Sequence, residues 1–279
     1  MTEAPVIRTM TRDDVDYAIR LAAKEGWNPG LSDAECFYAA DPKGFFISEL
    51  NGEPIGTISA VRYEGDFGFV GLYIMAPEAR GKGYGMELWK HAMTHLEGCN
   101  VGLDAVTEQE QTYTKSGFST FYRSTRFQGR GGGGRPAGVT PLEDIDFASI
   151  VAYDQQCFPG KREGFLHTWL EAAGAMGYGV LEGDQLKGFG VIRPCAVGYK
   201  IGPLFADNGD IAETLYKALV ASVPGEKFYL DVIEPNAAAG ELAKRHGLEE
   251  VFATVRMYTR EEPAMAMDKI FGVTSFELG

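Results

Sequence analysis

The sequence predicts an α/β fold made of two tandem copies of one domain, each a mixed, mostly antiparallel sheet flanked by helices. Short apolar runs separated by turns alternate with amphipathic helical stretches, which is typical of such a fold. Four segments of the first half recur in the same order in the second half, at offsets near 130 residues. The matched segments begin, in pairs, at Asp14 and Asp144, Gly44 and Gly177, Leu103 and Leu230, and Gly117 and Gly247.

The composition is that of a globular protein. The chain has 279 residues, of which 45% are apolar and 23% charged, and its length suits two domains. No run of 18 apolar residues occurs, and the first residues lack the basic start and the apolar run of a secretory signal. We therefore expect a cytoplasmic protein without a membrane partner, either a monomer or a homodimer.

The net charge of −13 bears on which molecules the protein can bind. An acidic surface repels nucleic acid and attracts cations, so we expect no nucleic-acid partner and some preference for an amine. A surface that only keeps the protein soluble explains the charge equally well. The cysteines form no CxxC pair, and His91 and His95 lack a third ligand nearby, so we expect reduced thiols and no metal.

Helix start signals open each copy. Thr11 and Asp14 can cap a first helix, and Thr140-Pro141 with Glu143 form the corresponding capping box in the second copy. A second helical stretch follows in each.

The rest of the first copy follows from its apolar runs. Turns at 51–52 and 64–66 separate three predicted strands, at residues 44–50, 54–63 and 67–75. An amphipathic helix, a strand, a short helix and a last strand complete the copy, with the helix at about 84–96, the strand at 101–106 and the last strand after Gly117.

A glycine-rich stretch, residues 129–138, lies near the middle of the chain. Glycine loses the most backbone freedom on ordering, so neither a helix nor a stable strand is expected there. We interpret the stretch as a linker between domains at 1–128 and 139–279; an RGG-like nucleic-acid segment is the alternative, which the net charge disfavours. The tail, residues 268–279, alternates enough to add an edge strand.

The segment with the clearest chemistry is Val70–Trp89, where an apolar strand passes through a Pro-containing turn into a glycine-rich loop that opens a helix. Backbone N–H groups at a helix N-terminus are unsatisfied, and the helix dipole adds positive charge. Glycines let an anion approach the backbone closely. The spacing is neither that of a Rossmann loop nor that of a Walker loop. A purely structural glycine turn is the alternative to an anion site.

The pattern R-G-x-G-x-G at Arg80–Gly85, after a strand that ends in x-P-x-x, resembles motif A of the GCN5-related N-acetyltransferases (GNAT). The resemblance implies that the loop binds the pyrophosphate of acetyl-CoA, mostly through main-chain atoms, while Lys82 steers anions from the solvent side. The implied cofactor-binding residues are Tyr73, Ile74, Met75, Arg80, Gly81, Lys82, Gly83, Tyr84 and Gly85.

Tyr113 begins a segment, Y-x-K-x-G-F, that is similar to one in the same family. The resemblance implies that its hydroxyl lies near the cofactor sulfur and protonates the leaving thiolate. A phenol of pKa ~10 can donate a proton to a thiolate whose acid has a pKa near ~8.5. A core tyrosine without a catalytic role is the alternative.

The implied reaction is direct transfer in a ternary complex. A neutral amine attacks the thioester carbonyl, and main-chain donors around Tyr73 to Met75 polarise the carbonyl oxygen. The general base stays open: Glu64 and Asp66 lie in a turn, and Asp104 has a counterpart in the second copy that suggests a structural role.

The connection between the first two helices, residues 25–33, usually lines the acceptor pocket in this superfamily. Trp27 offers an aromatic wall, and Asn28 and Asp33 offer polar contacts to a substrate. A Pro-Gly turn with a helix cap at Ser32 or Asp33 accounts for the same residues.

The second copy lacks both catalytic features. Its loop at 205–211 has one glycine, no arginine and two carboxylates, and Ala243 replaces the tyrosine. We therefore expect a degenerate second domain and an N-acetyltransferase that acts on a small-molecule amine. A protein or peptide N-acetyltransferase and a CoA-binding regulatory module without turnover are the alternatives.

Overall fold

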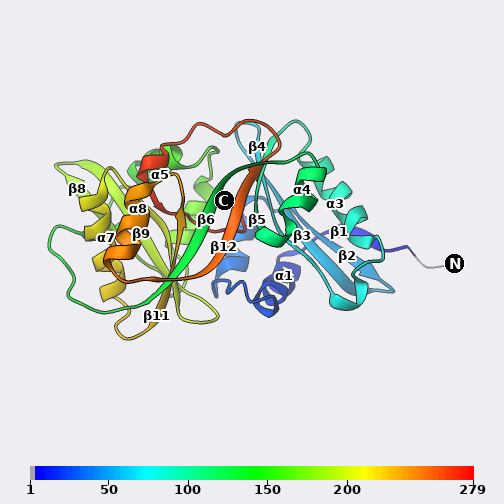
Figure 1. Ribbon diagram of the computed structural model, residues 1–279, viewed down its shortest axis with the longest axis horizontal. Helices are drawn as coiled ribbons and strands as arrows, with labels where there is room; N and C mark the ends of the chain where they lie inside the picture. Colours follow the sequence, from blue (N-terminus) through cyan, green and yellow to red (C-terminus); the bar gives the residue numbers. More distant parts are fainter. Residues whose placement is uncertain (1–3) are drawn as a thin grey trace.

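One continuous sheet connects the two halves of the chain. The computed structural model describes residues 4–279, and the sheet has 13 strands. The strand order is β1-β2-β3-β4-β5-β12-β6-β11-β10-β9-β8-β7, with β13 beside β10. Helices α3 (Tyr84–His95) of the first half and α7 (Gly209–Ala221) of the second half lie at opposite ends of the molecule (Figure 1).

The first half contains the elements expected from its apolar runs. These are β1 (Val6–Thr9), α1 (Arg12–Lys24), α2 (Asp33–Ala40), β2 (Phe45–Leu50), β3 (Glu53–Tyr63), β4 (Phe67–Met75), α3 (Tyr84–His95), β5 (Asn100–Val106), α4 (Glu110–Lys115) and β6 (Ser119–Arg130). The predicted strands and the long helix agree with them to within about one residue, which confirms the α/β fold.

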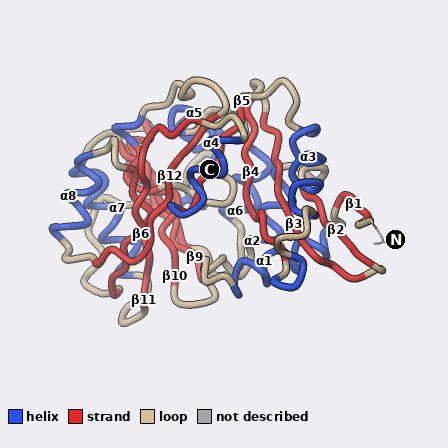
Figure 2. The backbone as a smooth tube through the Cα atoms, turned by 45° about the vertical axis from the view of Figure 1, so that its right-hand side comes forward, coloured by secondary structure: helices blue, strands red, loops and turns tan. Residues whose placement is uncertain are grey.

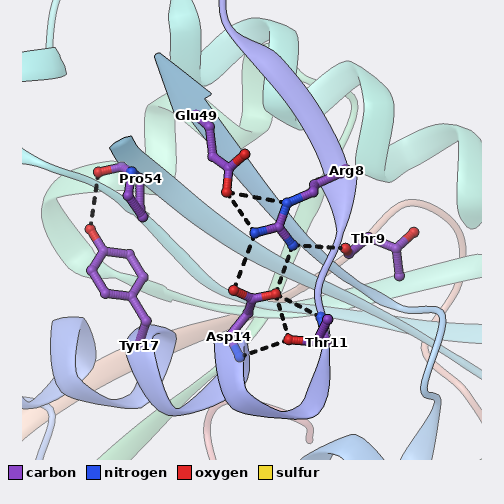
Figure 3. Close-up of polar contacts among 7 residues, drawn as sticks. All are labelled: Arg8, Thr9, Thr11, Asp14, Tyr17, Glu49 and Pro54. Atoms are coloured by element: carbon purple, nitrogen blue, oxygen red, sulfur yellow. Dashed lines mark hydrogen bonds and ion pairs between the residues drawn. The ribbon is translucent and has the colours of Figure 1, made fainter. Parts of the chain in front are cut away.

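The predicted capping box of α1 is confirmed. The backbone N–H of Thr11 donates to the Asp14 carboxylate at 2.8 Å, and the N–H of Asp14 donates to the Thr11 hydroxyl at 3.3 Å. Arg8 on β1 bridges the Asp14 and Glu49 carboxylates, which joins the helix start to the sheet (Figure 3). The Arg8 guanidinium also holds the pKa of Asp14 well below its usual range.

The second half repeats the order of elements. It contains β7 (Thr140–Pro141), α5 (Phe147–Cys157), α6 (Glu163–Leu170), β8 (Met176–Glu182), β9 (Gln185–Pro194), β10 (Tyr199–Ala206), α7 (Gly209–Ala221), β11 (Lys227–Ile233), α8 (Ala237–Arg245), β12 (Glu249–Tyr258) and β13 (Ile270–Gly272).

The capping box predicted at Thr140 is wrong. Thr140 pairs with Gly179 of β8, so its backbone is extended. A short 3-10 turn follows at 142–144, and α5 begins only after its N-cap residue, Asp146. Leu142 and Ile145 both pack into the core, and the backbone of Ile145, between the turn and the helix, is extended.

The two halves exchange their last long strands. β12, from the end of the chain, lies between β5 and β6, and β6 in turn pairs with β11 of the second half. Strands β6 (green) and β12 (orange) therefore run side by side through the centre of the molecule (Figure 1). Neither half holds a complete sheet made only of its own residues.

Two ion pairs fix this exchange. Arg126 on β6 binds Asp231 on β11 through two hydrogen bonds of 2.7 Å, and Arg256 on β12 binds Asp104 on β5 at 3.0 and 2.7 Å. All four side chains are buried. Asp104 and Asp231 occupy equivalent positions in the sequence repeat, and each forms a buried ion pair. This confirms the structural role expected for Asp104.

The glycine-rich stretch is less separate than expected. β6 runs to Arg130, and Gly129 pairs with Phe228 of β11, so the prediction that no strand enters this stretch is wrong at its first two residues. Gly131 then packs on the end of α7, where a Cβ would lie 2.0 Å from the Val223 carbonyl oxygen.

The tail forms a strand over three residues only, and that strand is not at an edge. β13 pairs with β10 beside β11, and residues 273–279 continue as a buried segment between the halves. The end of this segment lies near the centre of the molecule, beside β6 and β12 (Figure 2). No helix within residues 4–279 combines the length and the apolar character needed to cross a bilayer.

Candidate functional site

The site begins where β4 and β5 separate. The two parallel strands pair from Phe67 to Val70 on β4 and no further. At Leu72 the backbone enters the left-handed region (φ 46°), and the register against β3 shifts. The Thr57 hydroxyl donates to the Leu72 carbonyl at 2.9 Å and holds this bulge. Bulges re-aim a strand, and here β4 beyond Val70 has no partner strand on its β5 side within residues 4–279.

A cavity lies at this separation. Its lining comes from both halves: Trp27, Val70, Gly71, Leu72, Tyr73, Leu103, Asp104, Val106, Tyr113, Arg126, Phe252, Thr254, Phe276 and Glu277. The cavity therefore lies where the sheet is interrupted, and the α3 side and the α1 side both reach it.

The glycine loop lies at the start of α3. Gly81 (φ 73°) and Gly83 (φ 88°) adopt backbone conformations that side chains disfavour, and both are open to solvent. No acceptor among residues 4–279 meets the backbone N–H groups of Gly81 to Gly85, and no side chain caps the helix. Such a row of free donors at a helix N-terminus fits a pyrophosphate.

Arg80 and Lys82 differ in their surroundings. The Arg80 guanidinium donates to the Met75 carbonyl at 2.9 Å and to the Glu25 carboxylate, so its side chain ties the loop to the turn after α1. Lys82 is exposed at the solvent side of the loop.

Of the three strand residues predicted to meet the cofactor, only Tyr73 lines the cavity. Its hydroxyl lies over the start of α3, where a Cβ on Gly85 would come within 2.7 Å of it. A side chain at the third glycine of the motif would therefore displace this hydroxyl. Ile74 is buried in the core, and Met75 packs beside Gly85 and Gly56.

Tyr113 on α4 lines the same cavity. Its ring packs against Trp89 of α3 with centroids 5.5 Å apart. Burial raises the pKa of Tyr113 to about 12, and the neighbouring Tyr73 adds to this. The phenol therefore keeps its proton at neutral pH and is available as a donor.

The predicted acceptor residues separate into two groups. Trp27 lines the cavity, and its carbonyl accepts hydrogen bonds from Arg126 and Lys200. Asn28 and Asp33 do not line it. Asn28 makes two hydrogen bonds with the Val197 backbone, and Asp33 forms a buried ion pair at 2.9 Å with the second half.

The partner of Asp33 is Arg193 on β9. The polar residues of the connection between α1 and α2 therefore attach it to the second half. Two other carboxylates that the sequence offers as a general base, Glu64 and Asp66, are exposed in the turn between β3 and β4.

Within residues 4–279, no group of three His, Cys, Asp or Glu side chains is arranged to hold a metal ion.

The equivalent site in the second half is closed by its own chain. Asn208 caps α7 by accepting hydrogen bonds from the N–H groups of Asp210 and Ile211, so this helix start lacks the free donors of α3. β13 occupies the position between β10 and β11 that the cavity occupies between β4 and β5. Ala243 is a buried residue of α8.

Sequence reasoning missed the cavity residues that come from the second half. Phe252 lies on β12, and Phe276 and Glu277 lie in the tail. The only local signal in the tail is a glutamate within an otherwise apolar run, Phe276-Glu277-Leu278.

Comparison with known proteins agrees with this geometry. Residues 12–118 match the acetyltransferase (GNAT) family, and residues 150–272 match an acetyltransferase (GNAT) domain. The holothin acyltransferase of Pseudoalteromonas sp. (strain SANK 73390) is 34% identical over 92% of this chain and 89% of its own. The uncharacterized N-acetyltransferase YitH of Bacillus subtilis (strain 168) is 26% identical over 76% of this chain and 77% of its own.

Solved structures show the same fold. A putative acetyltransferase from Pyrococcus horikoshii superposes with a TM-score of 0.86 at 22% identity, over 99% of this chain and 96% of its own. A tandem GNAT protein from the clavulanic acid biosynthesis pathway gives a TM-score of 0.63 at 13% identity, over 93% of this chain and 98% of its own. The chain belongs to the GNAT family as a tandem protein, with one GNAT domain in each half.

Proposed function

We propose that this protein transfers an acetyl group from acetyl-CoA to the amine of a small molecule, in a ternary complex at the cavity between β4 and β5. One observation carries the proposal. The cavity is lined on one side by Tyr73, whose hydroxyl lies over Gly85 at the start of α3, and on the other by residues of the second half. The donor and the acceptor can therefore enter from different sides and meet at the interruption of the sheet.

Different residues of this chain bind the cofactor, stabilise the developing charge and donate the proton. Main-chain N–H groups of Gly81 to Gly85 hold the pyrophosphate. Acyl-CoA, when bound, supplies a thioester carbonyl that an amine can attack. The unpaired edge of β4 around Leu72 and Tyr73 supplies main-chain donors to the carbonyl oxygen, where negative charge develops. Tyr113 donates its proton to the departing sulfur.

The shape of the cavity favours a small acceptor over a peptide. The tail residues 273–279 are buried, and Phe276 and Glu277 form part of the cavity wall. A peptide acceptor needs an open groove, and the tail occupies the space on this side of the sheet. A cytoplasmic location and a monomeric or homodimeric state remain our predictions.

Turnover, rather than CoA binding alone, is supported by Tyr113. A module that only binds CoA needs the loop of α3 but has no need of a buried, protonated phenol in the cavity. The acyl group is a separate question, since the relative named for holothin is called an acyltransferase and its name does not specify acetyl.

The proposal is tested by following thiol release with acetyl-, propionyl- and hexanoyl-CoA, each with a panel of small amines and short peptides. We expect release that depends on a small amine, is highest with acetyl-CoA, and exceeds release with any peptide. Acyl-CoA binding without thiol release from any amine would leave the regulatory module as the better account. Faster transfer to peptides would favour the peptide acetyltransferase.

A further inference from the structure

The tail contributes a glutamate to the lining of the cavity. Glu277 is 3% exposed and lines the cavity beside Phe276, although more than two hundred residues separate it from the strand that carries Gly71. Its Oε2 atom is buried and has no hydrogen-bond partner among residues 4–279. A buried carboxylate is normally paired or hydrogen-bonded, so an unpaired carboxylate oxygen on a residue that lines a cavity points to a partner that binds there.

Each arginine around Glu277 is matched by an aspartate. Three buried arginines each bind one aspartate through two hydrogen bonds, in the pairs Arg126–Asp231, Arg193–Asp33 and Arg256–Asp104. Lys200 is also buried, and its ammonium donates to the Trp27 carbonyl at 3.3 Å. Among these buried carboxylates, Glu277 is therefore the one that accepts no hydrogen bond from an arginine within residues 4–279.

The tail that carries Glu277 is held firmly. The Tyr63 hydroxyl donates to the Leu278 carbonyl at 3.0 Å, and Arg162 donates to the Thr274 hydroxyl at 2.9 Å. Gly71 on β4 meets the tail backbone so closely that a Cβ there would lie 2.0 Å from the Glu277 carbonyl oxygen. The backbone at Glu277 is thus held by residues of both halves.

The two sides of the cavity have different characters. Tyr73 and Tyr113 pack with the core cluster that surrounds α3, where the loop lies. Trp27, Phe252 and Phe276 pack with the cluster on the opposite side of the sheet. Glu277 belongs to this second side, which is the side available to an acceptor once a donor occupies the first.

We propose that Glu277 binds the acceptor nitrogen and takes its proton during transfer, and that the aromatic wall of Trp27, Phe252 and Phe276 selects a compact amine with an apolar or flat body. This inference rests on the proposed function. The C–N bond forms as the C–S bond breaks; one proton passes from nitrogen to Glu277 and one from Tyr113 to sulfur. Proton return from Glu277 to Tyr113 through solvent completes the balance and leaves an amide and a free thiol.

Other ionisable groups line this part of the cavity or lie close enough to interact electrostatically with Glu277 or with the residues that line it. They are Asp104 on β5, Tyr113 on α4, Arg126 on β6, Arg193 on β9, Lys200 on β10 and Asp231 on β11. Burial raises the pKa of Tyr113 to about 12, and each aspartate is held by an arginine, so none of these three supplies a free base near neutral pH.

The test compares Glu277→Gln with a matched control, Asp268→Asn, which removes the same charge from an exposed position earlier in the tail. Calorimetry with acetyl-CoA measures the donor site, and steady-state kinetics with the best amine of the panel measures turnover. We expect unchanged acetyl-CoA affinity in both variants. kcat/KM for the amine should fall by about 100-fold or more in Glu277→Gln only.

The pH profile separates a proton acceptor from a merely structural residue. In Glu277→Gln, the rise of kcat/KM with pH should move up to the pKa of the free amine, while the Asp268→Asn profile stays that of the wild type. If Glu277→Gln does not fold, Glu277→Asp keeps the charge on a shorter arm and should lose turnover while keeping the wild-type profile.

Three outcomes would overturn the inference. One is a Glu277→Gln enzyme within threefold of wild-type kcat/KM. Another is a Glu277→Asp enzyme with full turnover where the glutamine variant is unfolded. The third is a wild-type protein that binds acetyl-CoA but turns over no amine, which overturns the proposed function as well and is recognised before any variant is made.

Discussion

The proposed role of Tyr113 as a proton donor can be tested by a single substitution. Replacing it with phenylalanine keeps the packing against Trp89 and removes only the hydroxyl. We expect kcat to fall by about 10²-fold, because general acid catalysis typically contributes that much, with acetyl-CoA affinity unchanged. Steady-state kinetics and calorimetry on the same preparation measure the two effects. Unchanged kcat would assign the proton to another donor, and Tyr73→Phe is the matched variant for that case.

The raised pKa of Tyr113 also sets a pH dependence. A group that must be protonated to act loses its activity as pH rises through its own pKa, which is about 12 here. We therefore expect no loss of kcat attributable to this phenol between pH 7 and about pH 10. A fall in kcat within that range that disappears in Tyr113→Phe would contradict the account.

At the residue scale, the sequence predicted what is local and missed what is distant. The loop glycines could be found because consecutive residues build the anion site, and their dihedral angles follow from their lack of a Cβ. Glu277 could not be found in this way, because its proposed role depends on where the fold places a segment that is distant in the sequence. Asn28 and Asp33 were selected for their chemistry, but their side chains bind the second half.

At the scale of elements, the start of α1 joins local capping to the sheet. Asp14 accepts hydrogen bonds from Thr11 and from Arg8, and Arg8 lowers its pKa. We expect Asp14→Asn to lower the free energy of unfolding by about 1 kcal/mol near neutral pH, as loss of a helix cap usually does. Denaturant unfolding of both proteins measures the difference.

The sign of the pH effect at Asp14 follows from the direction of its pKa. A carboxyl with a lowered pKa in the folded state stabilises the fold above its unfolded pKa, near 4, and this contribution disappears as pH falls below that value. The difference between wild type and Asp14→Asn should therefore shrink from pH 6 towards pH 3. A difference that is constant with pH would contradict the account.

Strands and helices of the first half were predictable because turn residues and apolar runs define them without reference to distant segments. Thr140 shows where this reasoning ends. The sequence around Thr140 matches a capping box, but pairing with β8 keeps the backbone of Thr140 extended. The helix begins later, at Phe147. Tertiary pairing overrode the local signal.

At the scale of the whole molecule, exchange of β6 and β12 makes the two halves one folding unit. A fragment that ends at residue 138 lacks β12, so β5 loses its neighbour and Asp104 loses Arg256. We expect this fragment not to fold alone, and co-expression with residues 139–279 to restore a complex that binds acetyl-CoA. Size-exclusion chromatography and calorimetry measure both. A soluble fragment with full affinity would refute the interdependence.

The same exchange predicts matched energetics for the two central ion pairs. Asp104→Asn and Asp231→Asn each leave a buried arginine without its counterion. We expect each to lower the free energy of unfolding by about 3 kcal/mol, within a single cooperative transition. Two separate transitions in denaturant unfolding would show that the halves unfold independently.

The sequence indicated two copies, and both copies are present, but it could not show that they exchange strands. The repeat places Arg126 and Arg256 at equivalent positions, and their partners Asp104 and Asp231 likewise. Either set of pairings fits that pattern. The observed one, in which each arginine binds the aspartate of the other half, follows only from the strand order.

The central claim is that one half of this tandem protein holds the working acyl-CoA site, at the start of α3. Gly83→Glu places a carboxylate among the free N–H groups, and Gly209→Glu is the matched change at the start of α7, where a Cβ meets no neighbour. Isothermal titration with acetyl-CoA is the direct measurement. We expect one site per chain in the wild type and in Gly209→Glu, and no binding in Gly83→Glu. Two sites per chain, or binding that survives in Gly83→Glu, would contradict the account.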